Sequence, residues 1–324
     1  MEVINKKLNQ LKIGQKASAL SKPDYEHHLS NQEQEPVPYS QAQIPVKSPL
    51  MFDVHLRHKF KIGSLLNEYY CVLMNKLLVF TDGDNDRLLI FNRDGSYNRE
   101  IELYGTPWYI SVINDSDIAV LYNTTKYIID IISIKTGTLS HSVKARGHIR
   151  VISFENGLLF VVTGNMIDVM NITGEPIRSF PVPPSHVLQK PNVKSKTFLP
   201  CPTPSSFGWN IANHKNRLFL TNAFNNTLCC CDLFGSVIWI FNDDTMKYPF
   251  GITTDGNGNV YLTCNDSSNV IAISSDGKHH KEILNEDDGL RRPSGICYDK
   301  LNDRLLVCDE GNGQAFLYDI KHST

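Results

Sequence analysis

A repeat of about 42 residues is the feature that most constrains what this chain can fold into. Segments 249–264 (PFGITTDGNGNVYLTC) and 293–308 (PSGICYDKLNDRLLVC) share Pro, Gly, Ile, Asp and Cys at an offset of 44 residues. Segment 260–277 aligns without gaps on 218–235 at an offset of 42 residues, and on 78–95 at an offset of 182 residues. A period of this length indicates an architecture in which one small unit is stacked several times.

A marker glycine ends most copies, and its spacing defines the number of units. The marker glycines are Gly95, Gly137, Gly174, Gly235 and Gly277. Their spacings are 42, 37, 61 and 42 residues, and the long interval contains a proline-rich insertion at 181–208. A last copy at 293–320 lacks the glycine, so we count six units.

Within one unit, short apolar stretches alternate with turn dipeptides. The best copy predicts strands over 251–254, 260–264, 269–274 and 279–284, separated by Asn-Gly and Asp-Gly pairs. Such pairs supply the positive φ that tight hairpins need. Four short strands in about 40–45 residues are typical of a propeller blade, and propellers have about 4–8 blades. The sequence therefore predicts an all-β, six-bladed β-propeller over 51–324.

The two ends of the repeat region predict how the ring closes. The last unit stops at Ile320 after three strands. We expect the missing outer strand to come from 52–62 (FDVHLRHKFKI), which precedes the first complete unit. Pairing both ends of the region in one blade would remove an open sheet edge.

The first fifty residues differ from the repeats. Residues 20–50 are rich in Gln, Pro, Ser and Glu and lack an apolar period, which predicts a disordered linker. Ile4, Leu8 and Leu11 follow the i, i+4, i+7 spacing of one helix face, so residues 1–19 are predicted to form a short helix. Two interpretations stay open: a frayed terminal helix, or a coiled-coil stub through which the chain oligomerises.

Composition excludes several function classes. Lys and Arg total 32 and Asp and Glu total 34, so nucleic-acid binding would require a local basic patch. No apolar run approaches the roughly 20 residues of a membrane span, and the N-terminus lacks the apolar region of a signal peptide. The eight cysteines form no CxxC pair, which favours buried free thiols in a reducing compartment. We therefore expect a cytoplasmic protein with no membrane contact.

The repeat motif also carries a family resemblance. The pattern P-x-G-I-x-x-D, followed by N-V-Y-L-T and N-V-I-A-I-S-S-D-G-K, resembles NHL repeats. As a set, the units over 52–320 are similar to the C-terminal propeller of tripartite-motif-like proteins, especially those expanded in bivalve molluscs. The resemblance implies an NHL-type propeller that serves as an adaptor or substrate receptor in the ubiquitin pathway. The RING finger and B-boxes of that family need Cys/His zinc spacing that this sequence does not show, so ubiquitin-ligase activity is not implied.

The repeats contain few of the residues that a catalytic site would need. Six-bladed propellers also resemble calcium-dependent lactonases and zinc-dependent lyases, whose sites need acids, amides or histidines converging on the central channel. The predicted inner strands begin without such a ring; only His148 and His214 lie near them, and no GxSxG motif occurs. We expect no catalytic residue, metal or cofactor. A metal-dependent hydrolase or lyase remains the third alternative.

Topology indicates where a partner would bind. In propellers, the loops that join strands two and three lie on the same face as the loops that join consecutive blades. The predicted blade-joining loops, about 104–108, 144–148, 181–208, 242–249 and 286–293, bring aromatic and basic side chains to that face. The candidate partner-binding residues are Trp108, Tyr109, His148, Arg150, Trp209, Lys247, Phe250, Arg291 and Arg292. The aromatic residues are either exposed anchors, which interfaces favour, or fillers of the wedges between blades.

Two ligand classes fit this face. Aromatic and basic side chains together suit unpaired RNA bases, which they stack and clamp. Acidic residues are predicted on the same face, however, and a mixed field favours a protein partner. They are Asp82, Asp84, Asp243, Asp244, Glu286, Asp287 and Asp288. We therefore predict a non-catalytic platform for a protein partner, with RNA as the alternative. The insertion at 181–208 is either a proline-rich recognition arm or an excursion of the chain that costs little stability.

Overall fold

The computed structural model divides into two compact units, Met1–Tyr39 and Ser40–Thr324. It describes residues 50–63, 70–74, 76–123, 127–183 and 208–322, all of which belong to the second unit. The predicted helix at 1–19, the predicted linker as far as residue 49, and residues 184–207 of the insertion lie outside the described residues.

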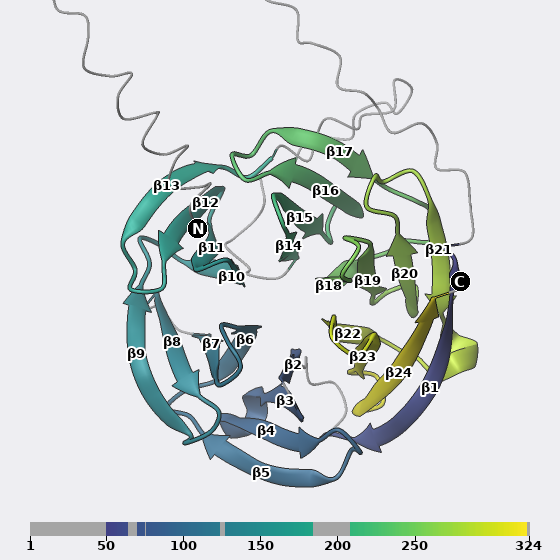
Figure 1. The fold of residues 1–324 in the computed structure, drawn as a ribbon, viewed down its shortest axis with the longest axis horizontal. Coiled ribbons are helices and arrows are strands. Elements are labelled where there is room, and N and C mark those ends of the chain that lie inside the picture. The colour runs from purple at the N-terminus through teal and green to yellow at the C-terminus, as the bar shows by residue number, and fades with distance from the viewer. Residues whose placement is uncertain (1–49, 64–69, 75, 124–126, 184–207, 323–324) are drawn as a thin grey trace, which may run out of the picture. The chain divides into compact units, whose positions relative to one another are not determined.

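Six four-stranded antiparallel sheets make up the described part of the second unit, and they stand around a common axis as the blades of a propeller (Figure 1). The predicted all-β, six-bladed fold is confirmed. Blade 1 comprises β2 (Cys71–Met74), β3 (Leu77–Asp82), β4 (Arg87–Asn92) and β5 (Tyr97–Glu102). Blade 2 comprises β6 (Pro107–Val112), β7 (Asp117–Tyr122), β8 (Ile128–Ser133) and β9 (Thr138–Lys144). Blade 3 comprises β10 (Ile149–Glu155), β11 (Leu158–Thr163), β12 (Met166–Asn171) and β13 (Pro176–Pro181).

The second half of the ring follows the same order. Blade 4 comprises β14 (Trp209–His214), β15 (Arg217–Asn222), β16 (Thr227–Asp232) and β17 (Val237–Phe241). Blade 5 comprises β18 (Pro249–Thr254), β19 (Val260–Cys264), β20 (Asn269–Ile273) and β21 (His280–Leu284). Blade 6 comprises β22 (Pro293–Asp299), β23 (Arg304–Asp309), β24 (Gln314–His322) and β1 (Phe52–Lys61). In every blade the first-named strand is nearest the axis (Figure 1).

Blade 6 closes the ring with strands from both ends of the repeat region. β1 pairs antiparallel with β24, from Phe52 opposite His322 to Lys61 opposite Gln314, with one irregularity between Leu56 and His58. The predicted outer strand at 52–62 is therefore confirmed. This pairing gives β24 a neighbour on its outer side, so blade 6 has the same four strands as the others.

The marker glycines lie where each blade meets the one before it. Gly235 connects β16 to β17 with φ of +89°, and a Cβ atom there would lie 2.6 Å from the ring of Phe180 on β13. Gly95 is equivalent: it has φ of +82°, and its Cβ would lie 2.7 Å from the ring of Phe60 on β1. A side chain would clash and would disfavour this left-handed backbone. The repeated glycine thus preserves the packing between blades as well as a turn.

The cysteines contribute to the packing between sheets. All seven described cysteines are free; Cys71, Cys230, Cys231, Cys264 and Cys308 are buried, and Cys229 and Cys297 are half-buried. Burial raises the pKa of the Cys230 thiol to about 12, so it is uncharged at neutral pH. The prediction of buried free thiols is confirmed for the five buried cysteines, whereas Cys229 and Cys297 are free but half-buried.

Candidate functional site

The topology gives the ring two faces. Because neighbouring strands are antiparallel, the loops between second and third strands emerge at the same end of each sheet as the loops that join consecutive blades. We call this end the joining face, and the other end the opposite face. All nine candidate residues named above lie in or next to the joining-face loops.

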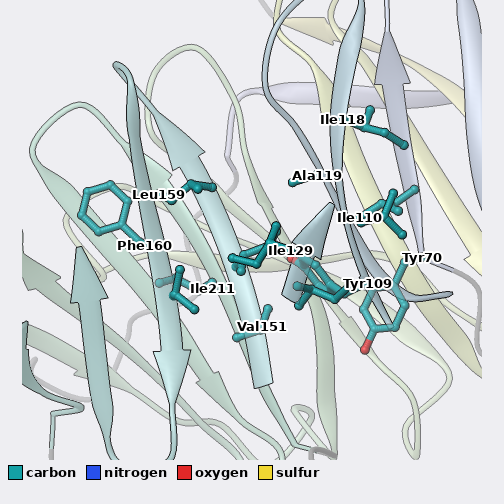
Figure 2. Packing of buried hydrophobic residues seen from close by; sticks show 14 of the residues in the cluster. Tyr70, Tyr109, Ile110, Ile118, Ala119, Ile129, Val151, Leu159, Phe160 and Ile211 are labelled. Carbon is teal, nitrogen blue, oxygen red and sulfur yellow. The ribbon is translucent and has the colours of Figure 1, made fainter. Parts of the chain in front are cut away.

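Aromatic rings fill the centre of the joining face. Tyr70, just before β2, has its ring centroid 4.7 Å from that of Tyr109 on β6 and 5.4 Å from that of Phe250 on β18 (Figure 2 shows Tyr70 and Tyr109). These three residues come from blades 1, 2 and 5, so the contact with Phe250 reaches past blade 6. We call this group the aromatic plug.

The aromatic candidates were expected to be either exposed anchors or fillers of the space between blades, and their burial decides between these roles. Tyr109 is 9% exposed and Phe250 is 3% exposed, so both fill the space between blades and leave little surface for a partner. Burial raises the pKa of the Tyr109 hydroxyl, which stays protonated. Trp108 and Trp209 are half-buried and pack against the same core, with the Trp108 ring 6.0 Å from that of Tyr70. Only these two candidate aromatics therefore retain a partly accessible ring.

His148 and Arg150 lie at the junction of blades 2 and 3. The His148 ring packs edge-on against Tyr127, with 6.2 Å between ring centroids, and Arg150 is half-buried on β10. Lys144 and Arg146 are exposed in the same junction. Four basic or titratable side chains thus lie within the segment 144–150 that joins blades 2 and 3, and one of them, His148, packs against Tyr127.

The remaining candidates, Lys247, Arg291 and Arg292, lie on the other side of the joining face. Nη2 of Arg292 lies 3.1 Å from Oε1 of Glu310, and its Nε donates to Oδ1 of Asn265 at 3.1 Å. The side chains of Lys247 and Arg291 are exposed. The nine predicted residues therefore do not form one site: they divide among the plug with its flanking tryptophans, the junction of blades 2 and 3, and the loops around blades 5 and 6.

Acidic side chains occupy one half of the joining face. The exposed acids of its described loops belong to blades 1 and 5 and to the connections on either side of blade 5. We define the acidic half by Asp84, Asp86, Asp244, Asp266, Glu286, Asp287 and Asp288. The sequence predicted a mixed field, whereas around the ring the acids are concentrated on one side.

Exposed apolar side chains occupy the other half. They lie on the connection between blades 1 and 2 and on the loops of blades 2, 3 and 4 that join second and third strands. We define the apolar arc by Tyr104 (59% exposed), Tyr127 (37%), Met166 (37%) and Phe224 (54%). The basic junction of blades 2 and 3 lies within this arc.

Tyr104 is held in place by the groups beneath it. Its ring centroid lies 4.5 Å from that of Tyr122, and burial together with hydrogen bonding to the buried carboxylate of Asp130 raises the pKa of its hydroxyl. The hydroxyl of Ser142 donates to the same carboxylate at 2.6 Å. An aromatic ring fixed in this way can bind a partner with little loss of side-chain entropy.

None of the four arc residues was among the candidates predicted from the sequence, although one of them, Phe224, is unusual in the repeat alignment. In the gapless alignment of the repeats, Phe224 occupies the turn position that Asp84 and Asp266 occupy in blades 1 and 5. An apolar residue at an exposed turn position where other copies have aspartate departs from the pattern of the repeat. That departure would have identified Phe224 before the structure was known.

The histidines near the inner strands do not converge. His148 precedes β10 on the joining face, whereas His214 ends β14 on the opposite face. His214 packs against Gly258, and burial followed by the nearby Lys300 and Lys215 charges lowers its pKa. Among the described residues no group of three or more His, Cys, Asp or Glu side chains could hold a metal ion. Within the same residues, no helix attains the length and hydropathy of a membrane span.

Comparisons with known proteins identify the fold alone. No family model matches the chain, and no curated protein matches it. The structure is similar to that of a structural genomics protein of unknown function from Bacteroides thetaiotaomicron, with a TM-score of 0.62 and 11% sequence identity. The match covers 83% of this chain and 76% of that one. The NHL and tripartite-motif-like resemblance therefore stays a prediction.

Proposed function

We propose that this chain is a non-catalytic binding platform that recognises a protein partner through the apolar arc of the joining face. β-Propellers commonly serve as interaction scaffolds. The observation that carries the proposal is that four exposed apolar side chains lie on successive loops of one face on either side of the exposed Lys144 and Arg146. The opposite face also exposes apolar residues, among them Tyr97, Leu139, Phe234 and Leu301. Single exposed apolar residues are normal on soluble proteins, whereas a gathering of them marks an interaction surface.

The predicted candidates have unequal roles in this proposal. Trp108, Trp209, His148 and Arg150 lie along the arc and contact the partner. Tyr109 and Phe250 support the surface from beneath through the aromatic plug, because they are almost fully buried. Lys247, Arg291 and Arg292 lie around blades 5 and 6, outside the apolar arc, so the proposal assigns them no contact with the partner. The role that fits is an adaptor or substrate receptor in a reducing, cytoplasmic compartment.

RNA is the alternative favoured by one specific observation, the aromatic and basic side chains at the junction of blades 2 and 3. Tyr127 and His148 pack edge to face there, beside Arg146 and Arg150. Bases stack on such rings and phosphates pair with such cations. An RNA-binding surface would show a steep loss of affinity with rising salt.

The deciding experiment compares the full-length protein with two double variants as baits in native cytosol. The test variant, M166S/F224S, removes two apolar side chains from the arc. The matched control, F234S/L301S, removes two from turns on the opposite face, where Phe234 is 65% exposed and Leu301 is 90% exposed. Half of each sample is treated with RNase.

Under the proposal, protein partners captured by the wild type persist after RNase, are retained by F234S/L301S and are lost with M166S/F224S. Partners that vanish with RNase, with RNA recovered from the untreated half, would favour the RNA alternative. Capture that is equal for all three baits would reject the arc as the binding surface.

A further inference from the structure

The basic side chains within the apolar arc indicate what charge its partner carries. Lys144 and Arg146 are exposed and Arg150 is half-buried, and none of the three forms an ion pair with a described residue. Some other arginines are paired within the fold: Arg87 with Asp82 and Glu100, and Arg292 with Glu310. Lys247 and Arg291, around blade 5, are exposed and form no ion pair with a described residue. The junction of blades 2 and 3 is thus a source of positive charge that the described fold does not use.

The acidic half limits how large an anionic partner can be. Its seven exposed carboxylates lie on the same face as the arc, around blades 5, 6 and 1. A long polyanion such as an RNA strand crossing the face would meet these seven carboxylates, which outnumber the exposed Lys247, Arg291 and Arg292 in the same region, and would be repelled. On the described joining-face loops of blades 2–4, a short acidic segment would meet the basic junction and no exposed carboxylate; the exposed carboxylate of Glu102 lies outside them, at the end of β5 and two residues before Tyr104.

The exposed apolar side chains of the arc indicate that the partner also carries apolar residues. Tyr104 and Phe224 are more than half exposed at the two ends of the arc, and the basic residues lie between them. Large apolar side chains on the partner would bury these rings, which interfaces use as anchors. A ligand that carries only charge would leave them in water.

From this pattern we infer that the apolar arc binds a short acidic peptide segment of another protein, with apolar anchor residues among its Asp and Glu side chains. This inference rests on the proposed function and specifies its ligand. The carboxylates pair with Lys144, Arg146 and Arg150, and the anchors pack on Tyr104, Tyr127, Met166 and Phe224. Because the charges at the rim stay partly solvated, they contribute mainly to selectivity and association rate, whereas the anchors contribute most of the affinity.

The test uses a random library of 12-residue peptides displayed on phage and selected on the full-length wild-type protein. Enriched peptides are then synthesised with a fluorescent label, and their binding is measured by fluorescence polarisation. K144E/R146E reverses two exposed charges in the arc. K135E/K278E makes the same charge change with exposed lysines in turns on the opposite face, and serves as the matched control. A single-stranded RNA of 12 nucleotides is measured in parallel.

We expect the enriched peptides to have a net negative charge and at least two large apolar residues. Their affinity should fall at least tenfold with K144E/R146E and with M166S/F224S, and change less than twofold with K135E/K278E. Thermal melting of each variant confirms that it is folded.

Failures of the two proposals can be told apart. Neutral or basic peptides that still require Met166 and Phe224 would overturn the acidic ligand and leave the binding face standing. Peptides that bind M166S/F224S as tightly as the wild type would overturn both. An RNA oligonucleotide that binds more tightly than every selected peptide, or a library without enrichment, would overturn the inference.

Discussion

The acidic half and the apolar arc are built from the same kinds of loops of the same repeat, yet they use their side chains differently. In the acidic half the polar groups bond to one another. The buried carboxylate of Asp309 accepts the backbone N–H groups of Arg291, Arg292 and Asn312. In the arc, the turn of Phe224 is also held by a side chain, because Oδ1 of Asn222 accepts the N–H groups of Phe224 and Asn225, but the turn exposes an apolar ring instead of a carboxylate.

In the loop before blade 6, side chains likewise accept hydrogen bonds from the backbone N–H groups of the loop itself. Asn285 accepts the N–H of Asp287 at 2.8 Å, and Asp288 accepts the N–H of Asn285 at 3.0 Å, so the two side chains cap one turn reciprocally. Loops of this kind are stabilised by their own side chains. The comparison teaches that loops of both halves are stabilised by their own side chains, and that the arc differs in the apolar and basic groups that it exposes and that a partner can contact.

The largest expected effect comes from opening the ring on the acidic side. Deleting residues 1–62 removes β1 and leaves β24 as an exposed edge in blade 6. We expect loss of cooperative thermal unfolding, measured by circular dichroism, because the strand that ties both ends of the ring together is gone. Deleting residues 1–50 is the control and should keep the wild-type melting temperature. An unchanged melting temperature in the longer deletion would contradict the closure by β1.

The second prediction concerns the plug that lies between the two halves. Phe250→Ala should lower the free energy of unfolding by about 3–5 kcal/mol, because a buried ring 5.4 Å from Tyr70 is removed and a cavity remains. Denaturant titration measures this loss. If Phe250→Ala were fully stable and yet lost the partner, Phe250 would be an exposed anchor after all.

A third prediction sharpens the contrast within the acidic half. Asp309→Ala should cost about 3 kcal/mol of unfolding free energy, because it leaves three backbone N–H groups without their carboxylate. Asp266→Ala, in the exposed turn of blade 5, should change stability by less than about 0.5 kcal/mol. Partner binding should survive both changes. Weakened binding by Asp309→Ala at full stability would mean that the partner also contacts the acidic half.

The fold was predictable from the sequence because its determinants are local. Alternating apolar residues, the marker glycines and the turn dipeptides each act over a few positions, and they predicted six blades and the closing strand at 52–62. The site was less predictable because its determinants lie between blades. Burial of Phe250 depends on Tyr70, which comes from the other end of the repeat region and meets it near the axis. The separation of acids from the apolar arc likewise becomes apparent only when the loops are arranged around a ring.

The smallest expected effect on stability is the most informative about binding. Phe224→Asp places in blade 4 the residue that blades 1 and 5 already have at this turn position, Asp84 and Asp266. Since Phe224 is 54% exposed, the unfolding free energy should change by less than about 0.5 kcal/mol. Affinity for an arc-dependent partner should fall at least tenfold, because an anchor is lost and a negative charge now faces the acidic ligand. Asp266→Phe, the reverse exchange in blade 5, should leave that affinity unchanged. Equal loss of affinity with both variants would show that the two halves bind one partner together.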